Sequence, residues 1–250
     1  MTKISLAGVI LTHNEAHNIA ACIEALGWAD EVLVFDSFST DDTVEAAKAA
    51  GARVAQQVFQ NYGAQRDAAL RAVSTDWVFF VDADERVPAA LAEEIQSKLA
   101  RPERGWWVPR HNYIFGRLTL GAGWYPDYQL RVLHRASARY DPMHPVHETV
   151  ILDGEAGYLE NPLIHYNYRD VAQFIDKQER YADIEAGHRF EQGMRPRART
   201  YLGAPARELY RRFIRLGGYR DGLHGLRLSV LMAWYELQTW RRVARLARSR

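Results

Sequence analysis

The first hundred residues alternate short apolar runs with amphipathic stretches, and this alternation restricts the possible fold more than any other feature. The apolar runs predict strands over Ile4–Leu11, Glu31–Phe35, Arg53–Gln56 and Trp77–Val81. Helical spacing of apolar residues, bounded by glycines and a proline, predicts helices over Asn18–Leu26, Thr43–Ala50, Ala64–Val73 and Pro88–Leu99. Such an alternation predicts an α/β fold with a mostly parallel sheet and helices on both faces.

The chain changes in character after Pro102. Strands rich in aromatic residues and arginine are predicted over Gly105–Tyr113 and Tyr128–His134, and the residues between them are typical of an irregular, ligand-facing half with antiparallel strands. From Val171 the pattern is helical to the end. We therefore expect one α/β domain over residues 1–170, with halves at 1–100 and 101–170, and a helical basic tail over residues 171–250.

Cysteine and charge content limit the class of protein. Cys22 is the single cysteine, so a disulfide within the chain and a zinc site of several cysteines are excluded, and a reducing compartment fits best. From residue 191 to residue 250 the chain carries 14 arginines against four acidic residues, whereas the remainder is net acidic. This asymmetry predicts an acidic surface as a partner, either a membrane or a nucleic acid.

Polar and acidic side chains follow three of the predicted strands. Thr12 and Glu15 follow the first strand, Asp36 follows the second, and Asp82 and Asp84 follow the most apolar one. In an open parallel sheet, ligands bind beyond these carboxyl ends. Two carboxylates about 5 Å apart repel by roughly 3 kcal/mol at an effective dielectric of 20, and a divalent cation would reverse that penalty. The aspartate pair therefore favours a magnesium or manganese site, with solvated loop ends as the alternative.

Four motifs, in this order and spacing, resemble the nucleotide-binding half of the family 2 glycosyltransferases, which have the GT-A fold. They are Val-Ile-Leu-Thr-His-Asn-Glu at 9–15, Val-Phe-Asp-Ser-Phe-Ser-Thr-Asp at 34–41, Gln-Arg-Asp at 65–67 and Phe-Val-Asp-Ala-Asp-Glu at 80–85. The resemblance implies that Thr12 and Glu15 line the nucleoside pocket. It also implies that Asp36 accepts a hydrogen bond from the base and that Arg66 sits over the base or the phosphates.

The same resemblance implies a divalent cation, magnesium or manganese, at the aspartate pair. Asp82 would face the ribose and the metal, and Asp84 would ligate the metal that bridges the diphosphate. A cation held by carboxylates neutralises the charge that develops on a leaving diphosphate. The chain departs from the family pattern at Phe38, where a small residue is usual, and at Asp67, where asparagine is common.

The second half resembles the bacterial lipopolysaccharide-core β-1,4-glucosyltransferase group of that family. The motifs are Gly-Trp-Tyr-Pro-Asp-Tyr-Gln-Leu-Arg at 123–131, Pro-Val-His-Glu at 145–148 and Leu-Ile-His-Tyr-Asn-Tyr-Arg-Asp at 163–170. The resemblance implies inverting transfer of a hexose, glucose from UDP-glucose, to a heptose of the lipopolysaccharide inner core. Another glycolipid or a surface polysaccharide as acceptor stays open, as does a non-catalytic sugar-binding or membrane scaffold of the same fold.

Inverting transfer needs a carboxylate that takes the proton from the acceptor hydroxyl and lies away from the metal ligands. Glu148, which closes a proline-bounded corner with His147, is the first choice for this base because it matches the family motif, and Asp127 is the second. Contacts to the acceptor or to a phosphate are expected from Arg131, His147, Trp124 and Tyr125. For each, an ordinary place on a strand face or in the core is the alternative.

Two other enzyme classes share part of the pattern. Phosphatases of the haloacid dehalogenase type also place Asp-x-Asp after an apolar strand, but they normally have Thr or Val at the position that Arg86 occupies. Nucleotidyltransferases would need an early glycine-rich phosphate loop with a lysine, which residues 11–18 lack.

The basic tail carries an apolar stripe at helical spacing, formed by Leu223, Leu226, Val230, Trp234, Leu237, Trp240 and Val243. A basic amphipathic helix of this kind lies in a membrane interface, and the absence of a recognition motif argues against nucleic acid. A helix packed back on the catalytic domain is the alternative. We expect a cytoplasmic protein, peripheral on the inner membrane.

Overall fold

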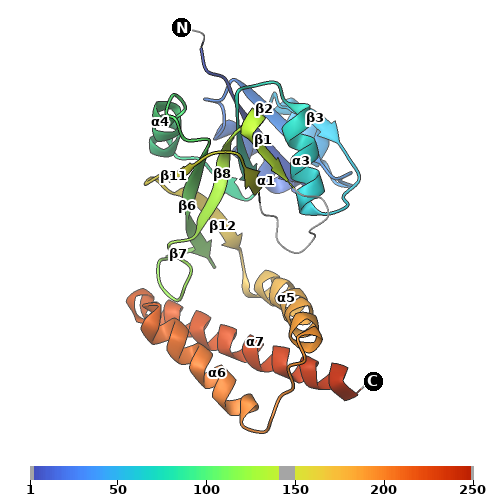
Figure 1. Cartoon of the computed structure of the whole chain (residues 1–250), viewed down its shortest axis with the longest axis vertical. Helices are drawn as coiled ribbons and strands as arrows, with labels where there is room; N and C mark the ends of the chain where they lie inside the picture. The colour runs from blue at the N-terminus through green and yellow to red at the C-terminus, as the bar shows by residue number, and fades with distance from the viewer. Residues whose placement is uncertain (1–2, 141–149, 249–250) are drawn as a thin grey trace. The chain divides into compact units, whose positions relative to one another are not determined.

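The structure is a computed structural model that describes residues 3–140 and 150–248. The chain forms two compact units (Figure 1), Met1–Arg110 with Tyr128–His165, and His111–Asp127 with Tyr166–Arg250. The second unit contains the whole predicted tail together with the segment of residues 111–127.

The first unit alternates strands and helices up to α4 and is then built mainly from strands. Its elements, two of which continue into the second unit, are β1 (Leu6–Thr12), α1 (Ala16–Glu24), β2 (Glu31–Asp36), α2 (Thr43–Ala49), β3 (Arg53–Gln56), α3 (Tyr62–Ala72), β4 (Trp77–Asp82), β5 (Glu85–Arg86), α4 (Ala89–Lys98), β6 (Gly105–Ile114), β8 (Tyr128–His134), η1 (Arg135–Ser137), β9 (Ala138–Tyr140), β10 (Val150–Leu152), β11 (Ala156–Tyr158) and β12 (Leu163–Tyr168).

The main sheet begins parallel and continues antiparallel. β1 pairs in parallel with β2 on one side and with β4 on the other, and β3 extends the sheet beyond β2. β8 then pairs antiparallel with β4, and β6 antiparallel with β8. The strand order is β3-β2-β1-β4-β8-β6-β12-β5. The predicted α/β fold of GT-A type, a mostly parallel sheet with an antiparallel portion and C-terminal helices, is confirmed.

Both faces of the parallel strands are covered by helices, which explains why these strands are apolar throughout. Successive side chains of a strand point to opposite faces. Ile10 of β1 packs in one cluster with Ile19 of α1 and Leu91 of α4, whereas Val9 packs in the other with Leu70 of α3. Each buried side chain of this size contributes about 1.5–3 kcal/mol, so the two clusters hold the carboxyl ends of the strands in place.

The second unit is mainly helical. Its elements are β7 (Arg117–Thr119), α5 (Val171–Glu191), α6 (Thr200–Tyr210), the π-helical turn η2 (Arg211–Arg215), η3 (Gly218–Asp221) and α7 (Gly222–Arg248). The long α7 packs against both α5 and α6 (Figure 1). Asp170 caps α5 by accepting the Gln173 backbone N–H at 2.8 Å. The core here includes Phe174, Leu228 and Tyr235.

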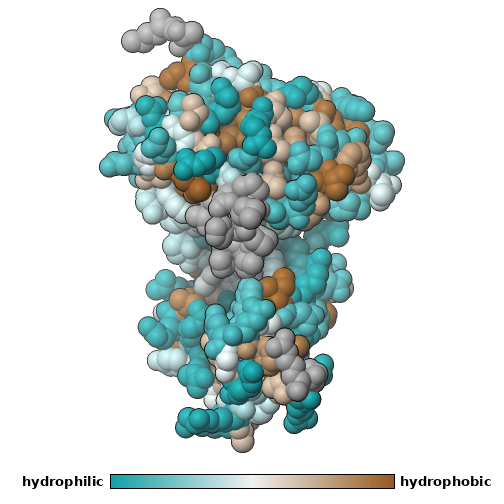
Figure 2. All heavy atoms as spheres, turned by 45° about the vertical axis from the view of Figure 1, so that its right-hand side comes forward, coloured by the Kyte–Doolittle hydropathy of each residue, from teal (hydrophilic) through white to brown (hydrophobic). Residues whose placement is uncertain are grey.

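The predicted apolar stripe of α7 is only partly exposed. Leu223, Leu226, Val230 and Trp234 are exposed, whereas Val243 is fully buried. The last stripe residues, Leu237, Trp240 and Val243, are three residues apart, which is less than the 3.6 residues of a helical turn. The stripe therefore turns gradually around the helix and reaches the core at Val243. On the face shown in Figure 2, apolar residues are scattered among hydrophilic ones.

None of the helices within residues 3–140 and 150–248 combines the length and the apolar character required to cross a bilayer.

Candidate functional site

Three strands of the first unit end at one edge of the sheet. Thr12 of β1 lies opposite Asp36 of β2, and Leu11 lies opposite Asp82 of β4. The Ser37 N–H also donates to the Thr12 carbonyl at 2.9 Å. The parallel register therefore gathers the polar ends of these strands, as the alternating sequence pattern predicts.

Asp36 is fully buried, and protein groups satisfy its carboxylate. Ser39 donates to it from its backbone N–H, at 2.9 Å, and from its hydroxyl, and the Gln56 side chain donates at 2.9 Å. Phe38 lies inside this loop with φ at 57°, in the left-handed region that is unfavourable for an aromatic residue. Asp36 therefore fixes the shape of the loop that follows β2.

The side chains of Thr12 and Glu15 differ in the hydrogen bonds that they form with other protein groups. The Thr12 hydroxyl is buried, and among the residues that the structure describes it has no hydrogen-bond partner. Leaving a buried polar group unpaired costs about 1–3 kcal/mol, which a ligand could recover. Glu15 lies at the start of α1 with 32% of its side chain exposed, and its carboxylate accepts from the Asn18 side chain at 2.8 Å.

Asp82 is held by a buried arginine on the neighbouring strand β8. Arg131 Nη1 lies 3.1 Å from Asp82 Oδ1, and Nη2 lies 2.6 Å from Oδ2. Arg66 Nη2, from α3, lies 3.7 Å from Oδ1. Burial alone would raise the pKa of Asp82, but Arg131, Arg66 and Arg110 outweigh it and hold that pKa well below its usual range. The sequence predicted Arg131 as a contact to the acceptor or a phosphate and did not foresee this partner.

Glu85 is a second buried carboxylate here, and the sequence pattern indicated no role for it. It accepts the Asp82 backbone N–H at 2.8 Å and Arg110 Nη1 at 3.3 Å, and Arg131 Nη2 lies 3.7 Å away. Burial raises the pKa of Glu85 although Arg131 opposes it. The sequence feature that could have indicated a role for Glu85 is its position at the end of the acidic motif at 80–85.

Asp84 points to a different partner. β12 pairs with β5, which places His165 opposite Glu85, and His165 Nε2 lies 3.6 Å from Asp84 Oδ2. The Asp84 side chain is 23% exposed, and no arginine within the described part of the chain pairs with it. Its negative charge is therefore less neutralised than that of Asp82.

A divalent cation fits this edge through a small number of protein ligands. Among residues 3–140 and 150–248, no three His, Cys, Asp or Glu side chains are grouped as a metal site. Magnesium, however, often uses one or two carboxylates and completes its shell with substrate phosphates and water. Asp84 suits that arrangement, whereas the bidentate pair with Arg131 occupies both oxygens of Asp82.

The other predicted residues belong to the second unit or lie outside the described residues. Trp124, Tyr125 and Asp127 belong to the second unit. Trp124 stands edge-on to Tyr168 with ring centroids 5.9 Å apart, and Asp127 accepts from the Asn112 side chain at 3.1 Å. Predicted residues His147 and Glu148 lie outside the described residues.

The comparisons with known proteins agree with this architecture. The model of "Glycosyl transferase family 2" matches residues 9–142. The lipopolysaccharide core biosynthesis glycosyltransferase LpsC of Rhizobium meliloti (strain 1021) is 31% identical over 95% of this chain and 91% of its own length. An uncharacterized glycosyltransferase of Rickettsia felis is 29% identical over 77% of this chain and 72% of its own.

Among solved structures, glucosyl-3-phosphoglycerate synthase from Mycobacterium tuberculosis, in complex with Mn²⁺, UDP-glucose and phosphoglyceric acid, has a TM-score of 0.49. It is 22% identical and covers 68% of this chain and 74% of that one. The family model covers more than half of the sequence, and LpsC aligns with nearly all of it. The chain therefore belongs to glycosyl transferase family 2.

Proposed function

We propose that this chain transfers a hexose from a nucleotide-sugar donor to the lipopolysaccharide core, specifically glucose from UDP-glucose to an inner-core heptose with inversion. The similarity to LpsC, which extends over 95% of this chain and 91% of the relative, carries the proposal. It includes the acceptor-side motifs and the helical region as well as the nucleotide-binding half.

The donor would bind at the edge where β1, β2 and β4 end. Thr12 supplies a buried hydroxyl for which the described part of the chain offers no hydrogen-bond partner, and Glu15 follows at the start of α1. Asp36 would accept a hydrogen bond from the base in addition to those from Ser39 and Gln56. Arg66, which lies 3.7 Å from Asp82, would pair with the diphosphate, because guanidinium groups match phosphate oxygens.

Asp84 would hold the divalent cation, magnesium or manganese, and Asp82 would orient the ribose under the control of Arg131. When bound, such a cation neutralises the charge on the departing diphosphate. Asp84→Asn should then abolish transfer, and it should reduce UDP affinity in manganese while leaving UDP affinity in chelator unchanged. The matched variant Asp30→Asn, at a carboxylate that pairs with Lys3 on the surface, should behave like the wild type.

A general base is required in addition. Glu148, which lies outside the described residues, is the proposed base, and Asp127 is the reserve. Glu148→Gln should reduce kcat at least about a hundredfold with little effect on donor affinity. Normal turnover of Glu148→Gln, together with an inactive Asp127→Asn, would transfer the assignment to Asp127.

Membrane attachment would use the exposed part of α7. Leu223 and Trp234 are 84% and 50% exposed, and Arg241 lies over the Trp234 ring at 5.7 Å. Apolar side chains beside arginines suit the interface of an anionic leaflet. Replacing Leu223 and Trp234 by serine should reduce sedimentation with anionic vesicles, and unchanged sedimentation would exclude this face.

The activity itself is testable with purified protein. UDP-glucose and competing nucleotide sugars would be incubated with truncated lipopolysaccharide that ends in inner-core heptose, and UDP release and the mass of the product would be measured. UDP release with addition of one hexose to the core is expected. Transfer from another donor, or the absence of transfer to the core acceptor, would reject the proposed specificity.

A further inference from the structure

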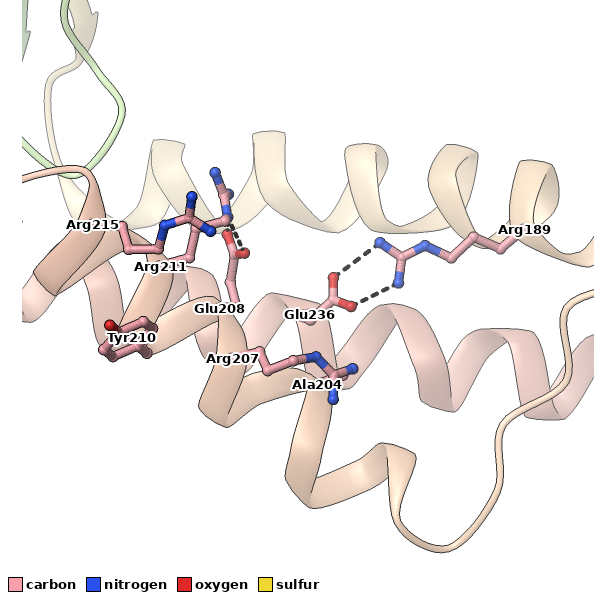
Figure 3. Close-up of a pocket in the computed structure, with 8 residues that line it drawn as sticks. All are labelled: Arg189, Ala204, Arg207, Glu208, Tyr210, Arg211, Arg215 and Glu236. Atoms are coloured by element: carbon pink, nitrogen blue, oxygen red, sulfur yellow. Dashed lines mark hydrogen bonds and ion pairs between the residues drawn. The ribbon is translucent and has the colours of Figure 1, made fainter.

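A pocket of about 420 Å³ lies within the helical unit, bounded by α5, α6, η2 and α7 (Figure 3). Its volume is within the range of about 300–1,000 Å³ that small-molecule sites occupy. Four arginines and two glutamates line it, namely Arg189, Arg207, Arg211, Arg215, Glu208 and Glu236. The lining is therefore rich in cationic donors.

The two glutamates are already neutralised. Arg189 and Glu236 meet in a bidentate pair from α5 and α7, with distances of 2.8 and 3.0 Å (Figure 3). Arg211 binds both oxygens of Glu208 at 2.8 and 2.7 Å, and Arg212 adds a third contact to Glu208 at 2.6 Å. Neither carboxylate is left to compensate the remaining arginines.

Arg207 and Arg215 are those remaining arginines. Within residues 3–140 and 150–248, neither guanidinium has a hydrogen bond or an ion pair, and both residues are exposed to solvent. The pocket thus presents two uncommitted cations with planar arrays of N–H donors.

Each uncommitted arginine has Arg211 four residues away, and Glu208 offsets the charge of Arg211 only in part because it also pairs with Arg212. Arg207, Arg211 and Arg215 follow one another at intervals of four residues along α6 and η2, and like charges at this spacing destabilise a helix. The turn that carries Arg211 and Arg215 is π-helical, a rare conformation that is frequent at functional sites. An anion placed between the arginines would turn this repulsion into attraction.

We propose that this pocket binds a phosphate group, as a phosphate monoester or a diphosphate. Guanidinium groups match the oxygens of phosphate in bidentate geometry, and the Tyr210 side chain in the lining offers a further hydroxyl donor. A phosphate monoester carries a charge of about −1.5 to −2, which corresponds to the two uncommitted arginines. The inference does not depend on the proposed glycosyl transfer, because binding requires no donor sugar.

The test measures binding to the full-length protein in two arms. Inorganic pyrophosphate is titrated by calorimetry, and vesicles of phosphatidylcholine with or without phosphatidic acid are tested by sedimentation. The double variant Arg207→Gln/Arg215→Gln should bind at least about tenfold more weakly. The control Arg101→Gln/Arg139→Gln removes the same charge from exposed positions outside the pocket and outside the basic tail and should bind within twofold of the wild type.

The two arms separate the sources of the phosphate. If the Arg207→Gln/Arg215→Gln variant loses binding only to pyrophosphate, the ligand is a soluble phosphate. If it loses binding only to vesicles with phosphatidic acid, the ligand is a lipid headgroup. Equal effects of the two double variants in both arms, or no binding by the wild type in either, would overturn the proposal. Phenylglyoxal labelling of the wild type gives a readout that needs no variant to fold. The bound probe should protect Arg207 and Arg215 but not Arg101, and equal labelling would again contradict the site.

Discussion

Replacing Arg131 by methionine should lower the free energy of unfolding of the first unit by about 3 kcal/mol. Arg131 Nη2 lies 2.6 Å from Asp82 and 3.7 Å from Glu85, and the Arg131 and Glu85 side chains are 5% and 0% exposed. Removing one member of a buried ion pair costs about 3–5 kcal/mol, because the other charge stays buried and unpaired. The lower end applies here, since 34% of the Asp82 side chain is exposed and Arg66 remains 3.7 Å away.

Urea unfolding followed by circular dichroism measures this loss, and hydrogen exchange of β4 and β8 locates it. Lys3→Met is the control, because the Lys3–Asp30 pair lies at the surface with side-chain exposures of 82% and 32%, and such pairs contribute less than about 1 kcal/mol. Arg131→Lys keeps the charge but not the bidentate geometry, so it should fall between the wild type and the methionine variant. The reasoning is refuted if Arg131→Met is no less stable than Lys3→Met.

Three further outcomes are expected. Asp36→Asn should cost about 1–3 kcal/mol in urea unfolding, because its amide nitrogen would face donors that need an acceptor; wild-type stability would contradict the bonding described for the loop. Burial raises the pKa of the Cys22 thiol. The stability that this group contributes is therefore complete below the unfolded pKa of about 8.5 and declines as the pH rises above that value. Rapid reaction of the native thiol with dithionitrobenzoate at pH 8 would argue against burial. Gly225→Ala should destabilise the helical unit by about 1–3 kcal/mol in thermal unfolding, because a Cβ would lie 1.9 Å from the Gly218 carbonyl oxygen. Gly187→Ala on α5, where a Cβ meets open space, should instead stabilise the protein by about 0.5–1 kcal/mol in the same measurement.

Local patterns were sufficient to predict the first half of the fold. Trp77–Asp82 is apolar up to its last residue and is buried on both faces, so the sequence indicated a strongly apolar strand. Its terminal aspartate had to emerge at a sheet edge, and the register with β1 confirms that position. Helix boundaries fell within two residues of the prediction where a glycine or proline marked them, as Pro88 does before α4.

Partners between distant segments could not be predicted in the same way. Arg131 lies among apolar residues of β8, and only the antiparallel pairing of β8 with β4 shows that it faces Asp82. His165 reaches Asp84 because β12 pairs with β5, a strand of two residues that has no sequence periodicity. The apolar stripe on α7 was predicted to lie on a single face of the helix. The structure differs, because the stripe begins at exposed residues and ends at Val243 in the core.

The position of β8 next to β4 has a consequence for synthesis on the ribosome. β4 ends at residue 82, but its antiparallel neighbour is complete only at residue 134. At about 5–20 residues per second, roughly 3–10 seconds pass in which an apolar strand has one side of its backbone unpaired. Such an edge invites association between nascent chains, so we expect chaperone binding and translation speed over residues 83–134 to govern the yield of folded protein.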